Sequence, residues 1–400
     1  MLSKKSPQLR FKGFTDDWED RNLKDILREF STKSKIENEY RVLSSTNVGM
    51  EFRDGRVSGT SNLGYKIIKN GDLVLSPQNL WLGNININNI GTGLVSPSYK
   101  TFNFTDIDSS FIKPQLRTPK MLEEYKNSST QGASVVRRNL EIDSFYQIKI
   151  ATPSIKEQEK IGSFFKHLDS TISLHQRKLD LLKEQKKGFL QKMFPKNGAK
   201  VPELRFAGFV DDWEERKLGD ISYKVKEKNK TGEFTETLTN SAEYGIINQR
   251  DFFDKDISNA KNLTGYYVVK NDDFVYNPRI SNFAPVGPIK RNKLGRTGVM
   301  SPLYYVFRTH DIDKNYFEKY FDTVYWHRFM ELNGDSGARA DRFAIKDSVF
   351  VEMPIPYPTM DEQQKIGSFF QQLDNTITLH QLKLDLLKEQ KKGFLQKMFA

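Results

Sequence analysis

The chain has 400 residues, a formal net charge of +11 and no cysteine. The absence of cysteine excludes disulfide frameworks, zinc ribbons and thiol nucleophiles, and the excess of lysine and arginine favours a polyanionic partner, nucleic acid above all, with simple solubility as the alternative. No apolar run approaches the roughly 20 residues that span a bilayer, and the N-terminus lacks an apolar signal core, so we expect a cytoplasmic protein with no membrane partner.

The first recognisable element is a short arm, Leu9–Ile26, which reads LRFKGFTDDWEDRNLKDI. It returns as Leu204–Ile221, and 13 of the 18 positions are identical. Its aromatic residues Phe11, Phe14 and Trp18 are most simply a hydrophobic clasp, with an exposed partner-binding role as the alternative. The duplicated arm predicts that the chain builds one frame twice.

Residues 27–150 differ in character from the arm, because short apolar runs alternate there with turn signals. This pattern is typical of a mixed α/β domain rather than of a βαβ rhythm. Three apolar strands run into polar loops, at Asn70–Gln78, Gly93–Tyr99 and Gly132–Arg137. Such loops usually present contact residues, so we look for the binding surface of this stretch on them.

A long helix is predicted from near Ser154 to Phe194, because apolar residues recur there at steps of four and three over more than four heptads. The segment Ile161–Phe194 returns as Ile366–Phe399 with 29 of 34 positions identical. Each helix would be about 60 Å long at 1.5 Å per residue, too long for a small domain to cover, so we expect the two helices to pack on each other. The predicted seam consists of Ile161, Phe165, Leu168, Ile172, Leu179, Leu182, Ile366, Phe370, Leu373, Ile377, Leu384 and Leu387.

The second variable stretch, residues 222–355, barely resembles the first, yet it echoes the three strand–loop motifs. The echoes are Asn271–Arg279, Gly298–Tyr304 and Gly337–Arg342. They predict a second mixed α/β domain with the same layout.

The loops of the two stretches carry different chemistry. The first is rich in amides, including Asn86, Asn88 and Asn89, and amides match the N6/N7 edge of adenine, whereas the second is rich in arginine, which matches the O6/N7 edge of guanine. For any single residue, the alternative is that it only forms part of a surface turn and contacts no ligand. As DNA-binding candidates we take Gln78, Asn79, Trp81, Asn84, Ser96, Ser98, Arg137 and Arg138 in the first stretch, and Asn277, Arg279, Asn282, Arg291, Arg296, Ser301, Arg339 and Arg342 in the second.

The order of the elements is cyclic. The second arm follows the first long helix directly, and the second helix ends at Phe399, where a further arm would begin. We therefore expect the chain ends to lie close together, with a pseudo-two-fold axis. The predicted fold class is α+β, with two mixed α/β recognition domains separated by two long helices. The domains are 1–150, the first recognition domain; 151–200, the central helix; 201–353, the second recognition domain; and 354–400, the distal helix.

No active site is predicted in this chain. It contains no G-x-x-x-x-G-K-[S/T] phosphate loop, and the segment Asn277–Ile280 lacks the second proline and the aromatic residue of an amino-methyltransferase loop. Asp169 and Glu184 imitate a nuclease spacing, but on one continuous helix they lie about 22 Å apart and cannot share a metal ion. We predict a non-catalytic protein with no metal site.

Three duplicated motifs resemble the DNA-specificity subunit of type I restriction–modification systems. They are the arm LRFxGF…DDWE, the helix starts PSIKEQEKI at Pro153–Ile161 and PTMDEQQKI at Pro358–Ile366, and the helix end LLKEQKKGFLQKMF. The resemblance covers essentially the whole chain. It implies that each recognition domain reads one half of a bipartite, asymmetric double-stranded DNA target, and that the central and distal helices pack antiparallel.

The same resemblance implies partners and cofactors outside this chain. The helices would scaffold two adenine-methyltransferase subunits and recruit restriction–translocase subunits, and S-adenosylmethionine, ATP and Mg would be bound by those partners. The alternative function is a stand-alone two-domain DNA-binding regulator or architectural protein. The DNA sequence that is read and its spacer length do not follow from the sequence.

Overall fold

The computed structural model describes residues 6–53, 61–132, 137–196, 198–252, 260–335 and 341–399. The chain divides into two compact units. Unit 1 comprises Met1–Arg177 together with Leu382–Ala400, and unit 2 comprises Lys178–Gln381, so each long helix contributes to both units. Across the described ranges, no helix combines the length and the apolarity that crossing a membrane requires.

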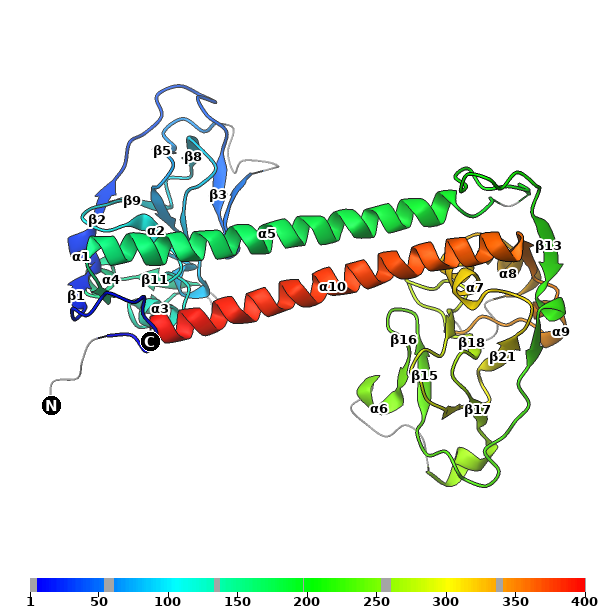
Figure 1. Cartoon of the computed structure of the whole chain (residues 1–400). Helices are drawn as coiled ribbons and strands as arrows, with labels where there is room; N and C mark the ends of the chain where they lie inside the picture. Colours follow the sequence, from blue (N-terminus) through cyan, green and yellow to red (C-terminus); the bar gives the residue numbers. More distant parts are fainter. Residues whose placement is uncertain are drawn as a thin grey trace. The chain divides into compact units, whose positions relative to one another are not determined.

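Unit 1 is built on a four-stranded antiparallel sheet in the order β2-β9-β6-β7. Figure 1 labels two of these strands, β2 and β9. The central strand β6 reads LVL and is buried on both faces, which explains its uninterrupted apolar sequence. Around the sheet lie the paired strands β1 with β12, β3 with β4, β5 with β8, and β10 with β11. The bounds are β1 Glu19–Asn22, α1 Leu23–Ile26, β2 Leu27–Phe30, β3 Leu43–Ser45, β4 Met50–Phe52, β5 Lys66–Ile68, β6 Leu73–Leu75, η1 Leu80–Leu82, β7 Ile85–Ile87, β8 Gly93–Val95, β9 Lys100–Phe104, α2 Ser109–Ile112, α3 Pro119–Asn127, β10 Ser129–Gln131, β11 Arg138–Leu140, α4 Ile142–Tyr146 and β12 Lys149–Thr152.

Unit 2 repeats this topology, although between the arm and the long helix its sequence barely resembles that of unit 1. Its four-stranded antiparallel sheet has the order β14-β21-β18-β19, which matches the sheet of unit 1 strand for strand. The strand β18 reads FVY and is again fully buried. The bounds are β13 Glu214–Lys217, η2 Leu218–Asp220, β14 Ser222–Lys224, β15 Leu238–Ser241, β16 Gly245–Asn248, α6 Gln249–Phe252, η3 Ala260–Gly265, β17 Tyr267–Val269, β18 Phe274–Tyr276, β19 Ile289–Arg291, β20 Gly298–Met300, β21 Tyr305–Thr309, α7 Lys314–Phe321, α8 His327–Asn333, α9 Asp347–Phe350 and β22 Pro354–Tyr357.

Two long helices run through the chain, α5 (Ile155–Lys192, 38 residues) and α10 (Met360–Met398, 39 residues). In unit 1 the start of α5 meets the end of α10, where the rings of Phe164 and Phe394 lie 5.0 Å apart. In unit 2 the end of α5 meets the start of α10 through Phe189 and Phe369, also at 5.0 Å. Within each unit the helices are therefore antiparallel, as the predicted fold class requires.

Ion pairs between the helices repeat with the same symmetry. Lys391 of α10 binds Asp169 of α5 at 2.6 Å in unit 1, and Lys186 of α5 binds Asp374 of α10 at 2.7 Å in unit 2. On each helix, the first two and the last two residues of the predicted seam are buried: Ile161, Phe165, Leu179, Leu182, Ile366, Phe370, Leu384 and Leu387. The four between them, Leu168, Ile172, Leu373 and Ile377, are half-buried.

Each arm clamps the start of a long helix. Arg10 donates two hydrogen bonds of 2.7 Å to the carboxylate of Glu157, whose side chain is fully buried, and Trp18 is buried nearby in the core of the unit. The Leu9 amide donates to the Lys397 carbonyl at 3.0 Å. The first arm therefore meets the end of the last helix, as the cyclic order of the elements predicts.

The second arm repeats these contacts one by one. Arg205 donates to the buried carboxylate of Glu362 at 2.7 and 2.8 Å, and the Leu204 amide donates to the Lys192 carbonyl at 2.8 Å. Trp213 is buried like its counterpart in the first arm. Trp18 and Trp213, with the partly buried Phe11 and Phe206, thus serve as the hydrophobic clasp that the sequence suggests.

The Glu-Gln pair at the helix start has two separate tasks. Glu157 binds the arm, while the amide oxygen of Gln158 accepts the backbone N–H of Asp108 at 2.9 Å, next to α2. In unit 2 the amide oxygen of Gln363 accepts the N–H of Asp313 at 2.9 Å, next to α7. This pair fastens the sheet domain of each unit to its long helix.

Candidate nucleic-acid interface

In unit 2, four of the predicted DNA-contacting residues line one groove of about 580 Å³: Asn277, Arg279, Ser301 and Arg342. They come from three places in the sequence, namely the exit of β18, the exit of β20 and the segment before α9. A backbone bridge between Arg279 and Arg342 brings the first and third of these segments together. The groove is therefore a product of the fold, and no single sequence motif describes it.

These four side chains have different tasks. Asn277 stabilises the loop itself, since its side-chain amide donates to the Asn240 carbonyl at 2.8 Å and its carbonyl oxygen accepts the Arg279 N–H at 3.0 Å. The hydroxyl of Ser301 accepts the Leu303 N–H at 3.4 Å. The Arg279 side chain is 65% exposed and its Nη2 lies 3.7 Å from Asp341, a distance at which a base or phosphate could replace the carboxylate. Arg279 is thus the most accessible donor of the four.

Two predicted arginines lie outside this groove and are engaged within the protein. The Arg291 side chain is only 8% exposed and binds Glu318 at 2.9 Å and Asn315 at 2.7 Å. Arg296 donates two hydrogen bonds of 2.8 Å to Glu236, which raises the pKa of the guanidinium. Both guanidinium groups are thus engaged in ion pairs within the described structure, although the Arg291 Nε–H has no hydrogen-bond partner there.

Two predicted residues of the second stretch remain, Asn282 and Arg339. Asn282 is exposed on a tight turn between β18 and β19. Arg339 lies outside the described residues.

In unit 1 the matching strand exit carries Gln78, which is exposed directly after β6. The Arg138 N–H donates to the Gln78 carbonyl at 3.2 Å, and the Arg138 guanidinium donates to the Ser129 carbonyl at 2.9 Å. The β6 exit and the β11 strand are thus joined as the β18 exit and the Arg342 segment are in unit 2. Gln78 and Arg279 occupy the same position in the two units.

The other candidates of the first stretch spread over neighbouring loops. Trp81 lies in η1, Asn79 and Asn84 lie on either side of it, and all three are half-buried. Arg137 is exposed beside Arg138. Ser96 and Ser98 follow β8, where their hydroxyls lie 3.0 Å apart in a local turn.

Two of the amides that made the first stretch appear rich in adenine-reading groups have a structural role instead. Asn88 is buried and donates to the carbonyls of Lys69 and Gly91, and Asn86 is buried and donates to Ser45 Oγ at 2.8 Å. They satisfy buried turns, so they do not face a ligand.

The sequence interpretation missed the apolar rim of the unit 2 groove. Phe283 is 79% exposed, and Tyr244 and Leu303 are also largely exposed. A sequence pattern assigns such residues to the core by default, and the only local signal is the turn-forming context of Phe283. The groove therefore combines arginine side chains with exposed apolar surface.

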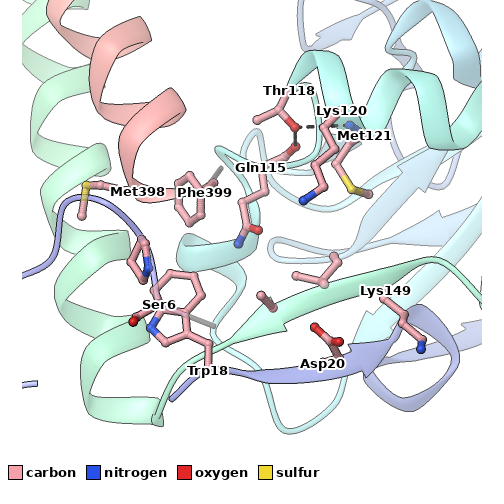
Figure 2. Close-up of a pocket in the computed structure, with 13 residues that line it drawn as sticks. Ser6, Trp18, Asp20, Gln115, Thr118, Lys120, Met121, Lys149, Met398 and Phe399 are labelled. Carbon is pink, nitrogen blue, oxygen red and sulfur yellow. Dashed lines mark hydrogen bonds between the residues drawn. The ribbon is translucent and has the colours of Figure 1, made fainter. Parts of the chain in front are cut away.

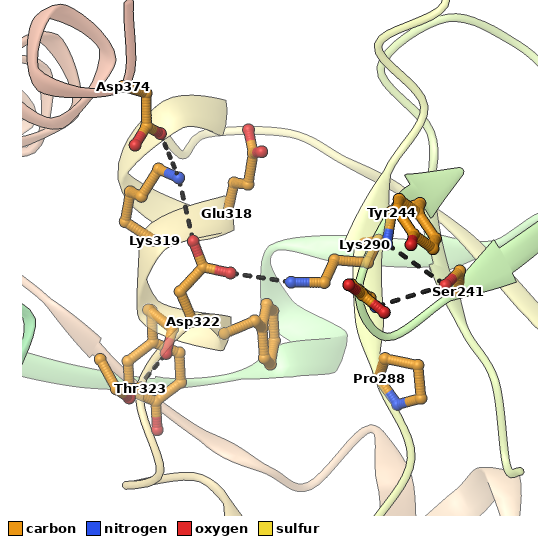
Figure 3. A network of polar contacts seen from close by, with 12 residues as sticks. Ser241, Tyr244, Pro288, Lys290, Glu318, Lys319, Asp322, Thr323 and Asp374 are labelled. Atoms are coloured by element: carbon orange, nitrogen blue, oxygen red, sulfur yellow. Dashed lines mark hydrogen bonds and ion pairs between the residues drawn. The ribbon is translucent and has the colours of Figure 1, made fainter. Parts of the chain in front are cut away.

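A chain of ion pairs ties the sheet that carries this groove to the long helices (Figure 3). Lys290 on β19 binds Asp322 at 2.9 Å, and Lys319 on α7 binds Asp322 at 2.9 Å and Asp374 on α10 at 2.8 Å. Burial opposes ionisation of Asp322, but the two lysines outweigh it and lower the pKa of this carboxyl. The groove is thus held on the helix through a fully paired charge network.

A smaller cavity of about 220 Å³ lies in unit 1 where the first arm meets the end of α10 (Figure 2). Trp18, Lys149, Met398 and Phe399 are among its lining residues. The Trp18 indole Nε1 has no hydrogen-bond partner, and neither has that of Trp213 in the repeated position, so the unpaired indole belongs to the arm and does not mark a ligand site. Within the described ranges, no cluster of His, Cys, Asp or Glu could hold a metal ion.

The chain matches a family model described as type I restriction modification DNA specificity domain, once over residues 15–184 and again over residues 210–389. Two curated relatives come from Methanocaldococcus jannaschii. The type I restriction enzyme MjaVIII specificity subunit is 23% identical over 297 residues, which cover 69% of this chain and 66% of the relative. The putative MjaX specificity subunit is 24% identical over 268 residues, which cover 62% of this chain and 57% of the relative. The chain therefore matches less than two thirds of the length of either relative.

Solved structures show the same fold at low identity. The S subunit of a type I restriction-modification system from M. genitalium matches with a TM-score of 0.61 and 13% identity over 99% of both chains. A chain from a structural study of complex assembly and conformational transition of the type I R-M system matches with a TM-score of 0.50 and 15% identity, over 98% of this chain and 99% of that chain.

Proposed function

Because this chain belongs to the family of type I restriction modification DNA specificity domains, we propose that it selects the DNA target of a type I restriction–modification complex. Each unit reads one half of a bipartite target. The observation that carries this proposal is that two units of identical sheet order place different side chains at one structural position, Gln78 after β6 and Arg279 after β18. An amide suits adenine and a guanidinium suits guanine, so the two halves of the target should differ.

The partner subunits bind on the long helices in this proposal. In unit 1, Leu174 on α5 and Leu382 and Leu386 on α10 are exposed, although their neighbours on the seam are buried or half-buried. In unit 2, Leu181 on α5 and Leu379 on α10 are exposed in the same way. Exposed leucines on two adjacent helices form a surface onto which apolar partner helices can pack. We assign these leucines to the binding of two adenine-methyltransferase subunits.

Catalysis resides outside this chain in the same proposal. The methyltransferase subunits bind S-adenosylmethionine, and restriction–translocase subunits bind ATP and Mg. This chain supplies only DNA recognition and a scaffold. A stand-alone DNA-binding regulator, the alternative function, would need no such partners.

Copurification with the methyltransferase tests the assembly. The wild-type chain should retain two methyltransferase subunits, and replacement of Leu181 and Leu379 by lysine should weaken that assembly while the isolated chain keeps its melting temperature. Val210→Lys serves as the matched control, since Val210 is exposed in unit 2 but lies in the arm. Tight, sequence-specific DNA binding by the chain alone, with no methyltransferase retained, would instead establish the regulator.

Methylome sequencing tests the division of labour between the units. Arg279→Ala or Arg342→Ala should weaken recognition of one half-site by about 1–3 kcal/mol if the arginine binds guanine with two hydrogen bonds. Gln78→Ala or Asn79→Ala should affect only the other half-site. Equal loss at both half-sites for every variant would refute the assignment of one half-site to each unit.

A further inference from the structure

The most exposed aromatic side chain at the unit 2 groove is Phe283, which stands at the tip of a tight turn. Its side chain is 79% exposed, although the transfer of a phenylalanine side chain out of water is favourable. The turn is closed by two backbone hydrogen bonds between Ser281 and Ala284, of 3.0 and 3.1 Å. The ring is therefore held out by a defined backbone structure.

The base of the turn is anchored in the core of unit 2. Ala284 and Val286 are buried, and the hydroxyl of Tyr276 on β18 donates to the Val286 carbonyl at 3.0 Å. The Gly287 amide donates to the Ala284 carbonyl at 3.1 Å. Because the backbone of this turn is already ordered, little backbone conformational entropy is lost when its apolar side chain enters a partner.

The surroundings of Phe283 indicate the kind of partner. Arg279 and Arg342 line the same groove, Tyr244 faces it as a second exposed aromatic residue, and Glu243 is its acidic member. A partner that offers negative charges together with flat apolar faces fits this arrangement. A DNA duplex with one opened base step has both features, phosphates along its backbone and stacked bases in its interior.

We propose that Phe283 is a wedge that enters a base step of the half-site read by unit 2, while Arg279 and Arg342 hold the flanking groups. This inference rests on the proposed function and adds a deformation of the DNA to it. The opened step should be a pyrimidine–purine step, because these steps unstack at the lowest cost. Unit 2 then selects sequence partly through the flexibility of the DNA and partly through contacts to base edges.

Unit 1 provides an internal comparison. Its β6–β7 connection contains no aromatic residue as exposed as Phe283, since Trp81 is half-buried. The connection is also held down, because the Arg117 guanidinium donates to the Gly83 carbonyl at 3.1 Å and to the Val48 carbonyl at 3.0 Å. The wedge should therefore deform only the half-site of unit 2.

The test uses the full chain assembled with its methyltransferase subunits on cognate DNA. Fluorescent base analogues, 2-aminopurine for adenine and pyrrolocytosine for cytosine, are placed one at a time through both half-sites. Methyltransferases extrude their target adenine, so 2-aminopurine should report that base in both half-sites. In the wild-type complex, fluorescence should rise at one further step of the unit 2 half-site and at no further step of the other half-site. Phe283→Ala should remove this signal and weaken binding about 5- to 150-fold, the range expected from alanine substitution of an aromatic residue that stacks on a base.

Two further variants keep the result interpretable. Phe283→Trp should retain the fluorescence signal, because a larger ring can still stack, and Val210→Ala should leave signal and affinity unchanged, because Val210 is 84% exposed in unit 2 but lies outside the groove. Wild-type fluorescence and affinity in Phe283→Ala would overturn the wedge while leaving the proposed function intact. Loss of the methyltransferase from Phe283→Ala, with normal fluorescence in what remains assembled, would make Phe283 a protein contact and also overturn it. A wild-type complex that binds all DNA sequences equally would instead refute the proposed function.

Discussion

Removal of Arg10 should release the first arm from the long helix α5. Arg10 is 13% exposed and donates two hydrogen bonds of 2.7 Å to Glu157, whose side chain is fully buried. Arg10→Met leaves a buried carboxylate without its partner, which costs about 3–5 kcal/mol. Glu157 lies in the first turn of α5, where the helix dipole returns only about 0.3–1 kcal/mol.

Hydrogen exchange measures this cost locally. A loss of about 3–5 kcal/mol corresponds to about 100- to 4,000-fold faster exchange, through opening, in the first turns of α5. The double variant Arg10→Met with Glu157→Met should recover most of the loss, because an apolar pair of similar volume is often as stable as a buried ion pair.

The repeat and the surface provide controls. Arg205→Met should have the same effect on the first turns of α10, because Arg205 binds the fully buried Glu362 in the same way. Lys200→Met should have no measurable effect, because the Lys200–Asp212 pair is exposed. Unchanged exchange in Arg10→Met, or a double variant as damaged as the single one, would show that this pair does not hold the arm.

Three further perturbations test the packing of the long helices and the charge network. Gly162→Ala should destabilise the chain by about 1–3 kcal/mol in thermal melts, because a Cβ atom there would lie 2.8 Å from the Ser110 carbonyl carbon. Gly188→Ala should instead stabilise the chain by about 0.5–1 kcal/mol, because no atom lies within 4 Å of the added Cβ atom. Equal shifts in melting temperature for the two variants would contradict this reasoning. Lys319→Met should destabilise unit 2 by about 1–3 kcal/mol in urea unfolding, because it removes the shared partner of two half-buried carboxylates. Asp322 then keeps only Lys290 and Asp374 keeps only Lys186, and no measurable loss would show that the network is dispensable. The pKa of the Asp322 carboxyl is lowered in the folded state, so the ionised carboxylate stabilises the fold above its ordinary pKa of 3.8, and this stabilisation is lost as the pH falls below that value. The loss should appear as faster hydrogen exchange in α7. Asp322→Asn should show no such dependence on pH.

The sequence predicts the frame of this protein well, because the signals of the frame are local or repeated. A heptad pattern depends only on residues three and four apart, so both long helices and their packing can be predicted without knowledge of the sheets. The duplicated arms predict the meeting of the first arm with the end of α10, and the Leu9–Lys397 hydrogen bond shows that meeting. Repetition here supplies the long-range information that a single copy lacks.

The candidate interface was less predictable, because the availability of a side chain depends on distant partners. Arg279 and Arg291 look alike in the sequence, yet Arg291 binds Glu318, 27 positions further along the chain (318 − 291). Asn88 resembles a loop amide, but it satisfies the carbonyls of a buried turn. For Phe283 the prediction is wrong in the opposite direction, because the sequence predicts that an apolar side chain is buried, whereas this one is exposed. Composition predicts the chemistry of the loops, but the fold decides which donors remain available.

The internal duplication separates mechanical from recognition requirements within one molecule. The side chains that are identical in the two copies include Arg10 and Arg205 with their partners Glu157 and Glu362, and these make the same bonds between arm and helix in both units. At the exits of β6 and β18 the sheet topology is the same, yet the side chains differ in size and charge. Each arm has to fit the start of a long helix, and the two helices have nearly the same sequence. The same arm–helix geometry therefore constrains the contact residues of both arms. The strand exits take no part in these bonds between arm and helix, and each unit can therefore change its loop chemistry without disturbing the frame. In the proposed function, this separation is the physical basis for two different readers on one scaffold.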